Sequence, residues 1–251
     1  MTDARSIFVD ALPGSVREQL NDPVAARLLP EYGAIFVAGA GVIPPDRIIF
    51  RDHGEVTQFQ DSVKVATVNF DQIAIELQAA AAERLTMAII EASELDLSIT
   101  PRSADSGRRS YNDTVELWHS RVEPALEHWT SKGKLDDALA DLIRSLPPFE
   151  QAPEVFALEA KGLFFAKDLS KSIIYSVAPP GTSQHLSMLA FDVSEFNEPK
   201  VRAILSDNFW YQTVTSDVPH FTYLGVSESD LPSLGLKKAF FADRDFWVPD
   251  I

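Results

Sequence analysis

The sequence predicts an α+β protein in which a small antiparallel sheet is flanked by helices. Residues 72–91 and residues 112–130 carry apolar residues at helical spacing, which is the pattern of a helix with one buried face. Short apolar or alternating runs bounded by glycine, proline and polar residues are typical of strands. Such runs occupy residues 34–37, 47–50, 95–100, 209–214 and 220–224.

The chain of 251 residues is predicted to form a single domain. Residues 1–70 are expected to be an N-terminal extension with short helices near 15–20 and 23–29, then strands, packed on a core of residues 71–251. The run Gly39-Ala40-Gly41 ahead of Pro44-Pro45 predicts a turn. It lacks the third glycine of a dinucleotide-binding loop, and the prolines block the helix that would bind a pyrophosphate.

Further elements follow from local patterns in the second half. Residues 134–146 read as a helix that ends at Pro147-Pro148, and residues 149–162 as a partly helical connection. We expect strands at 163–165 and 172–177 and a helix at 200–205. The aromatic tail, residues 239–247, is predicted to pack against the core, with an aromatic wall for a peptide groove as the alternative.

Composition excludes several classes of function. A net charge of −15 argues against nucleic-acid binding, which needs clustered lysine and arginine. The absence of cysteine excludes disulfides and thiolate metal sites. No apolar run is long enough to predict a membrane span, and no signal peptide is visible at the N-terminus. We therefore expect a cytoplasmic protein as the sequence is given, or a periplasmic or extracellular one if it was trimmed.

Three potential metal ligands lie close together in the sequence. His185, Asp192 and His220 fall within 40 residues, and imidazole and carboxylate are ligands that a catalytic zinc ion takes, with a fourth position open to water. Seven extended residues span about 23 Å, so the chain must fold back between His185 and Asp192. A hairpin with residues 188–189 at its turn would place these two opposite each other, and a third strand would add His220. The prediction is one Zn²⁺ per chain.

The same residues resemble a known family of zinc peptidases. The pattern Ser-x-His-x-x-Gly-x-Ala-x-Asp followed by Glu-x-x-His is similar to that of the D-alanyl-D-alanine carboxypeptidases, which include vancomycin-resistance dipeptidases, and the hedgehog signalling domain shares the metal site. Ser183, His185, Ala190, Asp192 and His220 stand at matching positions. Met188 replaces the family glycine and Asp217 the catalytic glutamate.

The resemblance also implies roles for residues outside the metal ligands. It makes Asp217 the catalytic base and Ser183 a hydrogen-bond partner of the substrate. An arginine from the loop at residues 102–111 would stabilise the oxyanion, with Arg109 as the best match and Arg102 as the competing one. Thr114 stands where the family has a glutamine.

The sequence as a whole therefore predicts a zinc-dependent metallopeptidase. Its partner would be a peptide, of the peptidoglycan type and cut near a D-Ala terminus, as the resemblance implies. The alternative is a catalytically degenerate relative that uses zinc for structure or peptide binding, suggested by Met188, Asp217 and Thr114. No pattern in the sequence specifies an oligomeric state.

Overall fold

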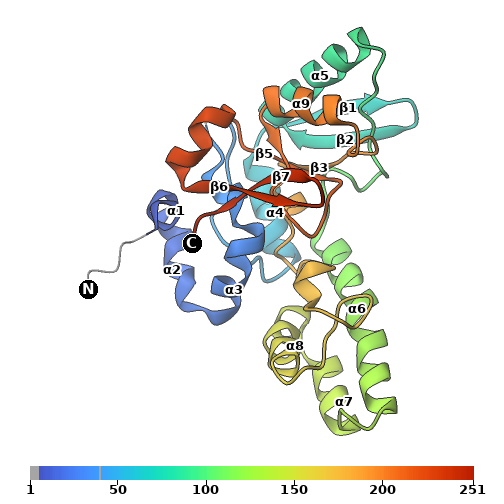
Figure 1. Cartoon of the computed structure of the whole chain (residues 1–251). Helices are drawn as coiled ribbons and strands as arrows, with labels where there is room; N and C mark the ends of the chain where they lie inside the picture. The colour runs from blue at the N-terminus through green and yellow to red at the C-terminus, as the bar shows by residue number, and fades with distance from the viewer. Residues whose placement is uncertain (1–5, 40) are drawn as a thin grey trace. The chain divides into compact units, whose positions relative to one another are not determined.

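The computed structural model has an α+β fold with small antiparallel sheets and describes residues 6–39 and 41–251 (Figure 1). Residues 1–5, where a signal peptide would begin, and Ala40 of the predicted turn lie outside the described residues. The chain groups into two compact units. The first comprises Met1–Ile48, Thr57–Arg109 and Gln184–Ile251, and the second comprises Ile49–Val56 and Ser110–Ser183. That all residues form one domain remains a prediction.

The N-terminal part of the first unit is helical. It contains α1 (Ile7–Ala11), α2 (Gly14–Glu18), η1 (Gln19–Asn21), α3 (Pro23–Tyr32) and η2 (Gly33–Val37). The helices predicted near 15–20 and 23–29 are confirmed, but the strands predicted at 34–37 and 47–50 are wrong. All five residues of η2 are buried, so this apolar run reflects burial on every side and not the pleat of a strand.

The segment predicted as one helix from residue 72 begins instead with a strand. β1 (Val65–Phe70) pairs with β2 (Ile73–Gln78), and α5 (Ala79–Glu94) follows directly. Asp71, which precedes the predicted helix and is of a residue type common at helix N-caps, lies in the turn of this hairpin, and Gln78 is the residue at the N-cap of α5. Ile73 and Leu77 fit both a helical spacing and strand alternation, because four residues are close to one helical turn and also two strand repeats. The pattern of apolar residues alone therefore could not distinguish a strand from a helix at residues 73–77.

A three-stranded antiparallel sheet in the first unit carries the candidate site. Its strands are β3 (Ala190–Asp192), β4 (Trp210–Tyr211) and β5 (His220–Tyr223), in the order β3-β5-β4. Helix α9 (Pro199–Asp207) lies between β3 and β4 in sequence and packs on α5. The predicted helix at 200–205 and strand at 220–224 are confirmed. Residues 95–100 form no strand, although Pro101 makes an isolated bridge to Val193.

The hairpin predicted for residues 185–192 is wrong. Residues Gln184–Ser187 form a 3-10 turn, η5, and β3 pairs with β5 over a long sequence separation. Met188 ends the turn with φ of +58° while completely buried. The left-handed region costs a side-chain-bearing residue roughly 1–2 kcal/mol, which explains physically why a glycine suits this position.

The C-terminal end of the first unit is a hairpin. The 3-10 segment η6 (Glu228–Leu234) leads into β6 (Leu236–Phe241), which pairs with β7 (Arg244–Pro249). Phe246 and Trp247 are buried, as expected for a tail packed on the core, whereas Phe240 and Phe241 are 74% and 56% exposed.

The second unit is mainly helical. Its principal helices are α6 (Tyr111–Ser131), α7 (Asp137–Ser145) and α8 (Gln151–Glu159), and α4 (His53–Ser62) runs from this unit into the first. Short 3-10 turns lie at Pro148–Glu150 and Ile173–Tyr175. Ser110 and Asp113 form a reciprocal capping box at the start of α6. The predicted helices at 112–130 and 134–146 are confirmed, but residues 163–165 and 172–177 form no strand.

Among the described residues, no helix is both long enough and apolar enough to cross a membrane.

The packing of the first unit at Gly235 can be tested against Gly133 of the second unit, a glycine with the same left-handed backbone. A Cβ at Gly235 would lie 2.1 Å from the backbone nitrogen of Phe8, whereas one at Gly133 would have nothing within 4 Å. Gly133→Ala should lower the free energy of unfolding by about 1 kcal/mol through backbone strain alone. Gly235→Ala should lower it by about 3 kcal/mol or more, because overlap is added to strain. Urea unfolding measures both, and equal losses would contradict the close approach of Phe8.

Candidate metal centre

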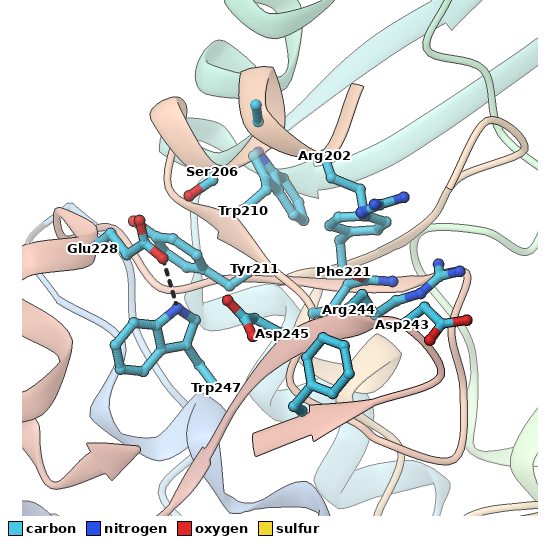
Figure 2. A pocket seen from close by; sticks show the side chains of 13 residues that line it. Arg202, Ser206, Trp210, Tyr211, Phe221, Glu228, Asp243, Arg244, Asp245 and Trp247 are labelled. Carbon is cyan, nitrogen blue, oxygen red and sulfur yellow. Dashed lines mark hydrogen bonds between the residues drawn. The ribbon is translucent and has the colours of Figure 1, made fainter. Parts of the chain in front are cut away.

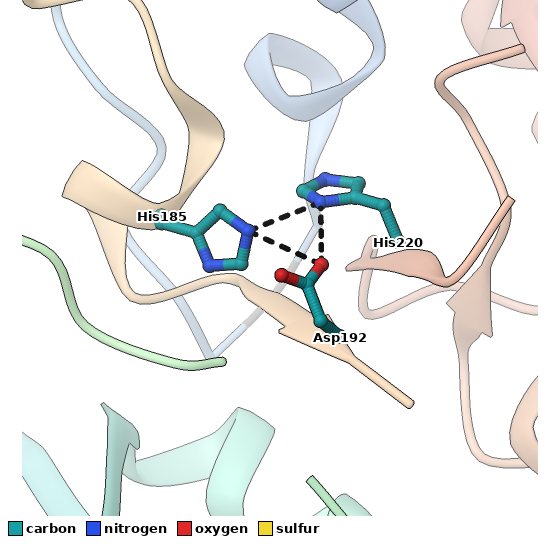
Figure 3. A group of neighbouring side chains, drawn as sticks. All are labelled: His185, Asp192 and His220. Carbon is teal, nitrogen blue, oxygen red and sulfur yellow. Dashed lines mark hydrogen bonds and ion pairs between the residues drawn. The ribbon is translucent and has the colours of Figure 1, made fainter. Parts of the chain in front are cut away.

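The pairing of β3 with β5 brings two of the three candidate ligands, Asp192 and His220, together. Asp192 stands directly opposite His220 in the antiparallel register, and directly opposite residues project from the same face of a sheet. His185 comes from η5, immediately before β3. Figure 3 shows the three side chains pointing toward one another. The tertiary structure thus gathers all three predicted ligands, although by a different pairing from the one predicted.

The spacing of the three ligand atoms suits a zinc ion. His185 Nε2 lies 3.1 Å from His220 Nδ1 and 3.3 Å from Asp192 Oδ1, and the latter two atoms are 3.2 Å apart. A tetrahedral zinc ion with bonds of about 2.0–2.1 Å places its ligand atoms about 3.3 Å apart. The side chains are largely buried, with relative exposures of 2% for His185, 12% for Asp192 and 6% for His220.

Hydrogen bonds on the outer side of each imidazole fix which nitrogen carries the proton. His185 Nδ1 lies 2.8 Å from the carbonyl oxygen of Gly107, which only accepts, so Nδ1 is the donor. His220 Nε2 lies 2.9 Å from Gln184 Oε1. The Gln184 amide is oriented by its Nε2, which donates to the carbonyl of Tyr32 at 2.9 Å. His220 Nε2 is therefore also a donor.

The inward atoms are consequently all acceptors. With both histidines neutral, His185 Nε2, His220 Nδ1 and the Asp192 carboxylate each present a lone pair, and these atoms all lie within 4.8 Å of one another. Three acceptors at these distances repel one another unless a proton or a cation lies between them. Outer hydrogen bonds that fix the tautomer are a regular feature of metal-binding histidines. The donor set therefore fits zinc.

The electrostatics of the cluster keep Asp192 charged and favour a neutral His185. Burial acts to raise the pKa of Asp192, but in the metal-free protein a proton between Asp192 and His185 or His220 outweighs burial and holds that pKa well below its usual value. Burial lowers the pKa of His185, because an imidazolium is poorly solvated there. Asp192 Oδ2, the oxygen facing away from the histidines' contacts, accepts from Arg109 Nη2 at 3.0 Å. Arg109 is thus a direct partner of a candidate ligand.

Two buried glutamines anchor the turn that carries His185. Gln60 Nε2 donates to the carbonyl oxygens of Leu186 and Arg109, at 3.0 and 2.9 Å. Gln78 Nε2 donates to the carbonyl of Ser187 at 2.9 Å. These bonds satisfy carbonyl groups that an irregular buried turn would otherwise leave unpaired. They also hold the strained backbone at Met188 in place.

Sequence reasoning missed the outer partners of the histidines. Gln184 lies inside the motif stretch, next to His185, and its type gave the only signal. Gly107 lies in the loop examined for arginines, and its carbonyl is the acceptor for His185. A Cβ at Gly107 would lie 2.5 Å from Ile75 Cγ2 and 3.0 Å from the carbonyl oxygen of Glu76. Glycine is therefore required for the loop to approach β2 this closely.

The other predicted site residues have different surroundings. Asp217 is exposed, in the turn before β5, and its carbonyl accepts from the backbone N–H of His220. Arg102 is exposed, with its guanidinium 5.7 Å from the ring centre of Phe196. Ser183 is the last residue of the second unit. Thr114 is buried in that unit, where its hydroxyl bonds the carbonyl of Tyr111 and the N–H of Gly181. Their catalytic and binding roles remain predictions.

Comparison with known proteins gives limited help. No protein-family model matches the chain, and no curated protein matches it. Among solved structures, it is similar to a mutant of the vancomycin-resistance D,D-pentapeptidase VanY from a VanB-type resistance cassette, in complex with Zn(II). The sequence identity is 15% and the TM-score 0.36, over 73% of this chain and 86% of that chain. At this identity and TM-score, the similarity says nothing about the chemistry of this chain, which is inferred below from its own side chains.

Zinc titration tests the metal centre directly. Metal-free protein should bind about one zinc ion per chain, and His185→Ala or His220→Ala should abolish tight binding. Gln184→Ala should weaken zinc affinity by about 10- to 100-fold, because His220 loses its outer partner. Plasma emission spectrometry and chelator competition provide the measurements. His119→Ala, which removes an imidazole from α6, is the matched control, and stoichiometric tight binding by His185→Ala would refute the assignment.

The proton affinity of His185 gives a second test. Its pKa in the metal-free protein should lie below the usual 6.5, because burial lowers it more than the Asp192 carboxylate raises it. The neutral, metal-binding form therefore persists as the pH falls through 6.5 and is lost only below the depressed pKa. An NMR titration of the His185 ring protons measures this value. A midpoint above 6.5 would contradict the burial of an unprotonated ring.

Proposed function

We propose that the chain is a zinc-dependent peptidase. The observation that carries the proposal is the convergence of three potential ligand atoms, from His185, Asp192 and His220, at the spacing that a tetrahedral zinc ion requires. A three-residue ligand set of histidine and carboxylate is typical of catalytic zinc, which keeps a further position for water. The motif around these residues supports a peptidase among the zinc hydrolases.

The reaction would be addition of water to a peptide carbonyl. When bound, zinc supplies Lewis acidity and lowers the pKa of a coordinated water toward about 7. In the proposed reaction Asp217 accepts the proton that this water loses and then passes it to the amide nitrogen that leaves. The exposed position of Asp217 leaves its carboxylate accessible to solvent and substrate.

Arg109 is the preferred residue for binding the developing oxyanion. Its Nη2 holds Asp192, and its Nε donates to the carbonyl of Asp105 at 3.1 Å. Among the described residues its Nη1 has no hydrogen-bond partner, so donors remain for a substrate oxygen. Arg102 is the competing assignment. Arg109 would thus link the charge of a ligand carboxylate to the reacting carbonyl.

The substrate class is proposed from the motif. A cell-wall-type peptide cut near a D-Ala terminus is what the resemblance of residues 183–192 and 217–220 favours, with the Ser183 hydroxyl hydrogen-bonding the substrate. The alternative, a relative that binds zinc without turnover, is an outcome of the same experiment.

Substitution at Asp217 tests the mechanism. Asp217→Asn should lower turnover of a D-Ala-D-Ala-terminated peptide by about 100-fold or more, because general-base assistance is lost, while zinc stoichiometry is unchanged. Asp217→Glu, which keeps the carboxylate, should retain activity. Release of D-Ala is followed by chromatography. Unchanged hydrolysis by Asp217→Asn would exclude this base, and one tightly bound zinc with no hydrolysis of any such peptide would favour the non-catalytic alternative.

A further inference from the structure

The loop that carries Asp217 joins β4 to β5 and ends at the candidate ligand His220. The backbone N–H of Asp217 donates to the carbonyl of Val214 at 3.1 Å, and the carbonyl of Asp217 accepts from the N–H of His220 at 3.1 Å. The Asp217 carboxylate is exposed and has no hydrogen bond or ion pair within the described residues. The backbone of the loop therefore sets where this carboxylate lies.

A buried carboxylate from another segment binds the residue that precedes Asp217. Glu31, in α3, is 9% exposed. Its Oε1 accepts from the Ser216 hydroxyl at 2.7 Å and from the Ser216 backbone N–H at 3.3 Å. Hydrogen bonds to a carboxylate are stronger than those to a neutral acceptor, and these two restrain both the backbone and the side chain of one residue. Glu31 thus holds the loop directly beside Asp217.

The same end of α3 supports the metal ligand that follows the loop. The carbonyl of Tyr32, the residue after Glu31, accepts from Gln184 Nε2 at 2.9 Å. Gln184 Oε1 is in turn the partner of His220 Nε2, at 2.9 Å. Two consecutive residues of one helix therefore restrain both the loop and the outer partner of a ligand. Because a helix is a rigid support, the loop and the ligand are fixed relative to each other.

The rest of the loop is held without Glu31. Gln212 Nε2 donates to the carbonyl of Val218, and the carbonyl of Gln212 accepts from the backbone N–H of Trp247, in β7, at 2.9 Å. The indole of Trp247 is itself fixed, because its Nε1 donates to Glu228 (Figure 2). Without Glu31 the loop is therefore expected to loosen locally, while the sheet stays paired.

Placement of the backbone matters more for an aspartate than for a glutamate. The side chain of Asp217 is one methylene shorter than that of glutamate, so its rotation corrects less of a displacement of the backbone. A misplacement of about 1 Å at a reacting group can lower the rate by about 100-fold. Restraint of Ser216 is therefore also restraint of the proposed base.

We propose that Glu31 is a positioning residue for the proposed base. It holds Ser216, and through the backbone of Ser216 it holds Asp217 beside the metal centre. The catalytic consequence rests on the proposed function, whereas restraint of the loop is a property of the folded chain alone.

Kinetics of the zinc-loaded chain with a D-Ala-D-Ala-terminated peptide test the catalytic consequence. Glu31→Leu should lower kcat about tenfold or more, because Asp217 is no longer held in place. KM should change by less than about twofold, since the group affected acts in the transition state. One zinc ion should remain bound per chain. Glu31→Gln, which keeps an oxygen acceptor for Ser216, should retain kcat within about threefold.

Glu159→Leu is the matched control. Glu159 is a buried carboxylate of α8, in the second unit, and it accepts in the same way from a serine hydroxyl and a backbone N–H, those of Ser172 and Ile173. Its replacement should cost stability as Glu31→Leu does, but it should leave kcat unchanged. A merely structural effect of removing a buried carboxylate would lower kcat in both variants.

Amide hydrogen exchange of the full chain tests the restraint without any activity. The Ser216 N–H should exchange about tenfold faster or more in Glu31→Leu than in the unaltered chain, because local opening no longer breaks a bond to a carboxylate. Ser216→Ala, which removes the hydroxyl alone, replaces Glu31→Leu if that variant does not fold. It should speed exchange at the same amide and lower kcat, each by about threefold.

The outcomes separate this inference from the proposed function. If the unaltered chain hydrolyses no such peptide, the proposed function fails, and exchange at Ser216 decides whether Glu31 holds the loop. The inference is overturned if Ser216 exchanges at the same rate in Glu31→Leu, if an active chain keeps its kcat in that variant, or if Glu159→Leu lowers kcat as far.

Discussion

The structure of the first unit depends on the meeting of three acceptor atoms in a buried space. Three inward acceptor atoms repel one another in a buried site, and a cation or a proton between them removes that repulsion. The hydrogen bonds on the outer side of the cluster also favour a bound cation. Gly107 and Gln184 hold the protons of the two imidazoles away from the centre, and Arg109 neutralises the far oxygen of Asp192. The protein therefore presents a preorganised set of ligands.

Much of the surrounding structure serves to hold one irregular turn. The turn that carries His185 makes few regular backbone pairings, and Met188 adopts a strained left-handed conformation at its end. Side-chain amides of Gln60 and Gln78 replace the missing pairings. Both glutamines belong to segments more than 100 residues away in sequence. Formation of the candidate metal centre is thus coupled to folding of the N-terminal half.

The short central sheet separates two kinds of chemistry. One face carries polar groups: His220 and Thr222 both contact Gln184 Oε1, and His220 also contacts Asp192. The other face is aromatic, with the Trp210 ring edge-on to Phe191 and tilted against Tyr223. Alternation along each strand is sufficient to divide them. The candidate metal ligands and the aromatic packing can therefore be built from adjacent residues of the same strand without sharing a side chain.

The sequence by itself determined the fold class, most helices and the identity of the three residues that converge, because ligand type and helical periodicity are local properties. It did not determine how they converge. Residues 185–192 allowed a local hairpin, and only the tertiary structure pairs Asp192 with His220. Likewise, the start of α5 could not be located from the sequence, because the spacing of Ile73 and Leu77 fits both the helical repeat and the strand repeat. The hydrogen bond from His185 to the carbonyl of Gly107 joins segments that are distant in sequence. Local sequence patterns do not predict such contacts.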